Sequence, residues 1–221
     1  MTLFVGADGY RDRWLVVVID DAGLREVFVE RAAAQVLAAV PDAASFAFDI
    51  PLGLPDEGLR DADTLARRLL ARRGSSVFAT FPRAVLESPT YQAALAATRE
   101  LGLPGISRQS YGLRAKIIEL DGVARSDERV IEAHPELSFY ALASDTPCTY
   151  PKKSWNGLAE RLALLTRAQL PLGETFPAVG TAPPDDVVDA AAAAWTARRY
   201  ARGEAVPLPE EPGERLGTIW R

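Results

Sequence analysis

Cysteine is almost absent from this sequence of 221 residues, in which Cys148 is the only one. No disulfide can form within the chain, and a reducing cytoplasm is the simplest location for such a protein. The first residues, MTLFVGADGYRDRW, lack the basic and long apolar segments of a secretory signal, and no stretch approaches the ~20 apolar residues of a membrane helix. We therefore expect a cytoplasmic protein without a membrane partner.

An excess of positive charge is also lacking, since 25 Lys and Arg face 30 Asp and Glu, for a net charge of −5. Non-specific binding to nucleic acid depends on neutralisation of phosphates by Lys and Arg, so the sequence excludes a protein that coats nucleic acid by bulk attraction. Walker-A and GxGxxG motifs are absent, which leaves P-loop and dinucleotide sites without support. The length and the 48% of hydrophobic residues fit one globular domain over residues 1–221.

The first fifty residues have the pattern of strands. Apolar, β-branched segments at residues 2–7, 14–19 and 24–29 are separated by turn residues and predict a meander of three antiparallel strands. An alanine-rich amphipathic segment at 32–40 predicts a helix, and the apolar run 45–50 predicts a fourth strand. A β–helix–β unit in one sheet favours a parallel crossover, so we expect the fourth strand beside the first.

The middle of the chain is basic and helical. Residues 60–116 contain ten Lys and Arg against four Asp and Glu, and helical periodicity predicts an insertion over about 56–125. A fifth strand is predicted at 129–133. The remaining elements are then a helix at 155–168, a loop at 170–184, a helix at 185–200 and a surface tail at 203–221, of which Ile219 and Trp220 could dock back.

Acidic residues stand at the ends of several predicted elements. They are Asp8 in the first strand, Asp49 in the fourth, Glu132 in the fifth, and Asp185, Asp186 and Asp189 at the start of the last helix. Sites form at the carboxyl ends of parallel strands, so neighbouring first and fourth strands would bring their acids together. Clustered carboxylates repel each other unless a cation lies between them, and Mg²⁺ or Mn²⁺ prefers such oxygen ligands. Two such ions can activate water in phosphodiester cleavage.

Two of these acids are poorly explained as surface residues. Asp49 lies inside the apolar segment FAFDIPLG, where an unpaired charge is costly, and Asp189 interrupts an apolar helix face. Asp8 has a simpler alternative, because Asp-Gly is a strong hairpin-turn signal, and both interpretations stay open. His134, the only histidine, is either a hydrogen-bonded core residue or a base.

Five blocks of sequence resemble those of one family. VGADGYRDRW, FDIPLGLP, GISRQSYGLRAKI, IEAHPELSF and PPDDVVDAAAAAWTARR occur in order between about residues 4 and 199, and they resemble the DUF429 family of predicted ribonuclease H-like nucleases. The resemblance implies an α/β, ribonuclease H-like fold, with a five-stranded mixed sheet flanked by helices and the helical insertion between strands 4 and 5. It also implies a metal-dependent nuclease-type site, with Asp8, Asp49, Asp186 and Asp189 as metal ligands.

The hypothesis for the site extends beyond the ligands. Glu132 joins the four aspartates as a candidate catalytic residue. The candidate substrate-binding residues are Arg67, Arg108, Gln109, Lys116 and Lys153. A guanidinium can clamp a phosphate, although arginines at helical spacing and a pair of lysines are also ordinary solvated residues. The positive charge of the insertion predicts that its arginines and Lys116 point towards the acids or towards their phosphate ligand.

The sequence is compatible with three functions. The leading hypothesis is a Mg²⁺- or Mn²⁺-dependent hydrolase acting on nucleic acid or a nucleotide, and a homo-oligomer is compatible with it. The alternative is a non-catalytic nucleic-acid or nucleotide binding module of the same fold. The third is an ATP-binding protein of the actin and sugar-kinase group, whose Asp-Gly turn in the first strand is similar. That group binds nucleotide between two such domains, and this chain has the length of one.

Overall fold

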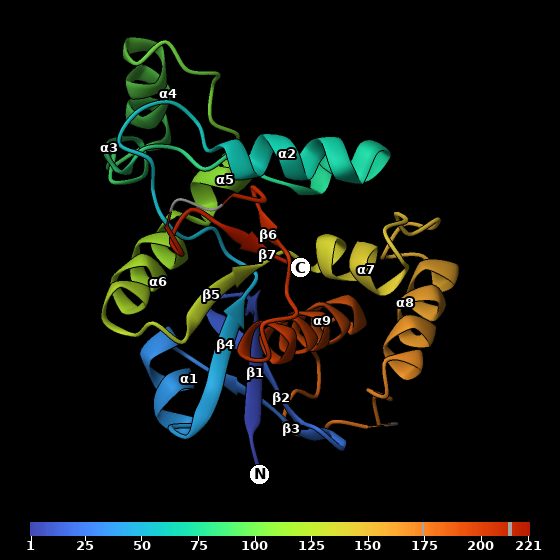
Figure 1. Ribbon diagram of the computed structural model, residues 1–221. Helices are drawn as coiled ribbons and strands as arrows, with labels where there is room; N and C mark the ends of the chain where they lie inside the picture. The colour runs from blue at the N-terminus through green and yellow to red at the C-terminus, as the bar shows by residue number, and fades with distance from the viewer. Residues whose placement is uncertain (174, 212–213) are drawn as a thin grey trace.

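A mixed sheet forms the centre of the protein in the computed structural model, which describes residues 1–173, 175–211 and 214–221 (Figure 1). Glu174 of the predicted loop and Pro212 and Gly213 of the predicted tail lie outside the described residues. The sheet has seven strands in the order β3-β2-β1-β4-β5-β7-β6. Their bounds are β1 Leu3–Tyr10, β2 Arg13–Asp20, β3 Gly23–Glu30, β4 Ala43–Phe48, β5 Val130–Ala133, β6 Pro207–Leu208 and β7 Ile219–Trp220.

Helices flank this sheet. They are α1 Ala33–Ala39, α2 Asp61–Leu70, the 3₁₀ helix η1 Ala71–Ser76, α3 Arg83–Leu86, α4 Tyr91–Glu100, α5 Arg108–Gly112, α6 Arg114–Ser126, α7 Pro135–Leu142, α8 Trp155–Arg167 and α9 Pro184–Ala201. The elements from α2 to α6 form the predicted insertion between β4 and β5, whereas the short helices α3 and α7 were not predicted. In the described part of the chain no helix combines the length and the apolar character needed to cross a bilayer.

The predicted meander and crossover are confirmed. Strands β1, β2 and β3 pair antiparallel, and β4 runs parallel to β1 on its other side. The boundary of β1 differs from the prediction, because the strand continues through Asp8 and Gly9 to Tyr10. The chain reverses afterwards at Arg11, whose φ is 53°. Asp8 is therefore paired within the sheet, opposite Leu15, and the hairpin-turn explanation of Asp8 is wrong.

The alternation of side chains along β1 divides the core into two layers. Val5 and Ala7 are fully buried on the face covered by α1 and by α3 to α6 of the insertion. Phe4 belongs to the opposite face, which packs against α7, α8 and α9. Because residues two apart share a face of a strand, Asp8 lies on the side of α9. The sheet therefore presents Asp8 to the same helix that carries Asp189.

Gly6 sets how closely α9 approaches the sheet. A Cβ atom built on Gly6 would lie 2.1 Å from the Ala190 oxygen and 2.1 Å from the Ala194 nitrogen, distances that no carbon atom can occupy. The alanines from 190 to 194 are fully buried. The backbones of β1 and α9 can thus touch only because Gly6 has no side chain and the facing residues of α9 are alanines. This contact fixes the position of Asp189 relative to Asp8.

Gly6→Ala should force α9 away from β1. We expect a loss of more than the 1–3 kcal/mol typical of overpacking in the free energy of unfolding, since the obstacle is backbone that cannot rotate away. Urea unfolding measures the loss. Gly122→Ala is the matched control, because Gly122 lies within α6 with nothing near its added Cβ, and it should raise stability by up to about 1 kcal/mol. Equal stabilities of Gly6→Ala and wild type would contradict the packing argument.

The end of the chain corrects two predictions, the five-strand sheet and the surface tail. Residues 207–208 and 219–220 form β6 and β7, which extend the sheet beyond β5 to seven strands. Ile219 is 1% exposed, and the rings of Trp220 and Tyr200 pack edge to face with centroids 4.8 Å apart. Strands of two residues are too short to produce a periodic pattern, so only the apolar pair 219–220 indicated that the tail docks.

Candidate metal centre

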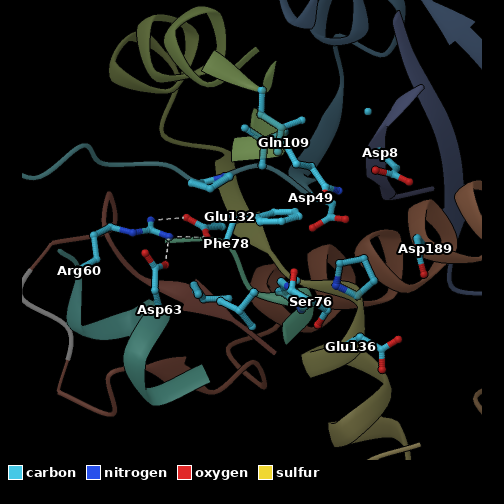
Figure 2. Close-up of a pocket in the computed structure, with 18 of the residues that line it drawn as sticks. Asp8, Asp49, Arg60, Asp63, Ser76, Phe78, Gln109, Glu132, Glu136 and Asp189 are labelled. Carbon is cyan, nitrogen blue, oxygen red and sulfur yellow. Dashed lines mark hydrogen bonds and ion pairs between the residues drawn. The ribbon is translucent and has the colours of Figure 1, made fainter. Parts of the chain in front are cut away.

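Three aspartates converge at the carboxyl end of β1. Asp8 comes from β1, Asp49 directly follows β4 and Asp189 lies on α9; each offers a carboxylate oxygen, and these oxygens lie within 4.8 Å of one another (Figure 2). The Asp49 amide donates a hydrogen bond of 2.9 Å to the Ala7 carbonyl, so the β1–β4 ladder continues one residue past β4. The predicted convergence of these three residues is present in the structure.

Burial and mutual repulsion raise the pKa of all three carboxyls. Asp8 is 8% exposed and Asp189 1% exposed. Desolvation raises the pKa of Asp49 and of Asp189 to about 7, and Lys152 only partly offsets this. For Asp8, desolvation and then the charges of Asp49 and Asp189 raise the pKa well above its usual range. Three anions in one buried place have an electrostatic need for a cation.

Lys152 supplies one positive charge to this cluster. Its Nζ donates to Asp189 Oδ2 over 2.5 Å. Burial alone would lower the pKa of Lys152, but the ion pair with Asp189 and the charges of Asp49 and Asp8 raise it above the ordinary value. Lys152 was missing from the predicted site, where its neighbour Lys153 stood. Adjacent lysines have the same sequence signal, and only the fold decides which of them faces the acids.

Asp186, the fourth predicted ligand, lies one turn before Asp189 at the rim of the cluster. It is half-buried and is not one of the three residues whose oxygens meet. Burial and the neighbouring Asp185 raise the pKa of Asp186, and its charge in turn raises the pKa of Asp8. Its side chain therefore influences the cluster through space, at longer range than Asp49.

Glu132 belongs to a different set of charges, on the far side of the same pocket. Arg60 donates to both of its oxygens, over 2.6 Å and 2.9 Å, and to Asp63 over 2.5 Å. The Leu52 amide also donates to Glu132, over 2.6 Å. In Figure 2 this group lies opposite Asp8 and Asp189, with Phe78 between them in this view. Burial raises the pKa of Glu132, and Arg60 acts against this rise.

The two sets of charges line one pocket of about 190 Å³. Its wall includes the predicted residue Gln109 from α5 and also Phe78, Lys152, His134 and Glu136. Within the described residues, His134 Nδ1 and Glu136 Oε2 are buried without a hydrogen-bond partner. Burial lowers the pKa of His134, which favours the neutral form of its imidazole. These two buried atoms thus belong to residues that line the pocket.

The basic residues of the insertion are engaged elsewhere. Arg67 donates from Nε and Nη2 to the Val77 carbonyl, and Arg108 lies over the ring of Tyr91 at 4.6 Å from its centroid. Lys116 donates to the Arg13 carbonyl over 2.5 Å. Burial lowers the pKa of Lys116, and Asp8 is among the charges that oppose this lowering. Lys116 is therefore close enough to Asp8 for the two charges to interact.

The donor set fits a hard divalent cation. It consists of carboxylate oxygens from three separate elements, which is the chemistry that Mg²⁺ and Mn²⁺ prefer. The raised pKa values show that these oxygens repel each other in their buried position, and a cation between them would relieve this repulsion. Asp8, Asp49 and Asp189 are therefore the residues that could hold a metal.

Comparison with known proteins identifies one family. The model of the family described as "Protein of unknown function (DUF429)" matches residues 6–214, which is nearly the whole chain. No curated protein and no solved structure gives a significant match.

Proposed function

The chain belongs to the DUF429 family, and from its own geometry we propose that it is a divalent-metal-dependent phosphodiester hydrolase, a nuclease of the ribonuclease H-like superfamily. The observation that carries the proposal is the convergence of Asp8, Asp49 and Asp189. A buried triad of carboxylates on a central strand, its parallel neighbour and a helix has little structural use, because it destabilises the protein that contains it.

The arrangement of the sheet supports this fold assignment. A meander of β3, β2 and β1 followed by a parallel β4 and β5, with α9 laid across β1, agrees with the ribonuclease H-like order expected from the motifs. The two strands at the edge, β7 and β6, are additions from the end of the chain.

The chemistry divides between the metal and the protein. A bound Mg²⁺ or Mn²⁺ would activate water and stabilise charge on the phosphoryl oxygens. Asp8, Asp49 and Asp189 would hold the ion, and Asp186 at the rim would add negative charge beside it. Lys152 has a flexible ammonium that can turn from Asp189 to a phosphate oxygen when a cation arrives. Gln109 in the pocket wall is placed to donate to substrate.

One observation favours the second candidate, a non-catalytic binding module. The ammonium of Lys152 already neutralises part of the charge on the aspartates, over 2.5 Å from Asp189. A permanent ion pair would leave the acids with the role of positioning the loop that carries Lys152. Metal binding separates the two candidates, because only the hydrolase needs it.

Incubation of the purified protein with single-stranded and duplex oligonucleotides in Mn²⁺, in Mg²⁺ and in EDTA tests the proposal. We expect cleavage only with metal, and a loss of at least 100-fold in rate for Asp49→Asn, because a charged ligand is replaced by a neutral one. Glu26→Gln on the exposed side of β3 is the control and should cleave like wild type. Metal-independent products, or full activity of Asp49→Asn, would refute the assignment.

A further inference from the structure

An exposed aromatic and basic segment lies directly beside the aspartate cluster. Trp155 is 80% exposed and Tyr150 45% exposed, and Lys152 and Lys153 lie between them in the chain. Most aromatic side chains in the described part of the protein are buried or half-buried, as Trp14 is at 0%. Tryptophan with this exposure at a pocket rim is typical of a surface that stacks a ligand.

Lys152 connects this segment to the candidate metal centre. Its side chain lines the pocket of the aspartates and also a neighbouring hollow of about 450 Å³. Lys153, Trp155, Pro183 and Pro184 form most of the other walls of that hollow. A ligand on Trp155 would therefore be separated from Asp189 by one flexible side chain.

We propose that residues 150–155 form a platform for single-stranded nucleic acid, on which a base stacks against Trp155 while Lys153 contacts the backbone phosphate. The inference rests on the proposed function and names its substrate class. Aromatic side chains interleaved with lysines are the two components of single-strand binding, stacking and electrostatic attraction. The strand would continue past Lys152 towards Asp8, Asp49 and Asp189.

The burial of the aspartates favours a single strand over a duplex. With 1% of Asp189 and 8% of Asp8 exposed, the carboxylates lie inside a pocket of about 190 Å³ rather than on an open face. A single strand or a frayed end can bend a phosphate into that pocket, whereas a duplex keeps its bases stacked on each other and away from Trp155.

Charge favours nucleic acid over a protein partner. Lys153 is exposed and takes part in none of the ion pairs of the described residues, and its neighbour Lys152 gains freedom to move when a divalent cation neutralises Asp189. The acid that lines the same hollow, Asp185, lies at the first turn of α9. Two lysines beside an exposed indole attract a polyanion such as nucleic acid more strongly than they attract a neutral protein surface.

Fluorescence anisotropy of a labelled single-stranded oligothymidine, measured in EDTA, tests the platform without any cleavage. Trp155→Ala should weaken binding about 5- to 150-fold, which corresponds to the 1–3 kcal/mol of one stacked base. Lys153→Ala should reduce the magnitude of the salt slope by roughly 0.7. Leu101→Ala, which removes another exposed apolar side chain, 48% exposed, from a different surface, should bind like wild type.

The outcomes distinguish this inference from the proposed function. Binding that depends on Trp155 without metal-dependent cleavage supports the platform and sinks the hydrolase. Cleavage by Trp155→Ala with unchanged affinity keeps the hydrolase and overturns the platform. An equal affinity of wild type for duplex and single strand, or loss of self-association rather than of oligonucleotide binding in Trp155→Ala, also overturns it. The loss of self-association would make Trp155 a contact between two copies of the chain.

Discussion

In EDTA, the free energy of unfolding should fall as the pH is raised from about 4 to about 7. Asp49 and Asp189 have a folded pKa of about 7 against 3.8 for the free side chain, because burial and neighbouring anions disfavour their charged forms. The folded protein therefore holds protons that the unfolded chain has lost. For a single carboxyl this difference is on the order of 4 kcal/mol.

The direction follows from proton binding in the two states. Below pH 3.8 these carboxyls are protonated in both states, and their stabilising contribution is fully present. Between 3.8 and about 7 only the folded state keeps the protons, so stability decreases with each step in pH until the carboxyls ionise. His134, whose pKa is lowered, acts in the opposite direction within this range, because the unfolded chain binds its proton more tightly.

The variant Asp49→Asn distinguishes the contribution of the aspartates to the pH dependence of stability from that of His134. The amide removes one buried charge and part of the repulsion on Asp8 and Asp189, and it leaves His134 in place. We expect the fall between pH 4 and pH 7 to shrink by several kcal/mol in urea titrations of this variant. Saturating Mn²⁺ should also remove the fall in wild type, since a metal binds the deprotonated carboxylates. If the free energy of unfolding depended on pH in the same way in wild type and in Asp49→Asn, the aspartates would not repel each other.

The same physical signal singled out the converging aspartates and Glu132, although the structure places Glu132 in a different set of charges. Asp49, Glu132 and Asp189 all stand in apolar segments, where a charge needs a partner. Asp49 and Asp189 lie beside other acids, with Lys152 paired to Asp189, whereas Glu132 is paired with Arg60, which comes from 72 positions away in the chain. A residue far away in sequence cannot be paired by local pattern, so a structural ion pair and a metal ligand have the same sequence signature.

The longer helices and strands and the crossover were predictable because each spans enough residues for a period to appear, whereas α3, α7, β6 and β7 were not predicted. The close contact of Gly6 with Ala190 was not, since a missing side chain has no periodicity, and only the packed helix gives it meaning. The direction of the basic side chains was not predictable either. Arg67 binds a carbonyl, and Arg108 covers an aromatic ring, because local partners outcompete a distant site.

Arg60→Met should cost about 3–5 kcal/mol of the free energy of unfolding, the usual loss when one partner of a buried ion pair is removed. Arg60 is 7% exposed, and it is bound to Glu132 and Asp63, which are 4% and 2% exposed. Methionine fills similar space but leaves two buried carboxylates facing each other. Arg202→Met is the control, because the Arg202–Asp21 pair is exposed and should be worth less than about 1 kcal/mol.

The change in melting temperature that Mn²⁺ causes in Arg60→Met then shows whether Glu132 is a structural residue of the pocket or a metal ligand. If Glu132 serves the architecture of the pocket, the variant melts at a lower temperature but keeps the wild-type increase in melting temperature on addition of Mn²⁺, because Asp8, Asp49 and Asp189 are intact. If Glu132 is a ligand held in place by Arg60, the variant loses that increase along with its stability. Calorimetry in EDTA and in Mn²⁺ distinguishes the two results, and we expect the first, since four hydrogen bonds from Arg60 and the Leu52 amide already occupy the Glu132–Asp63 pair.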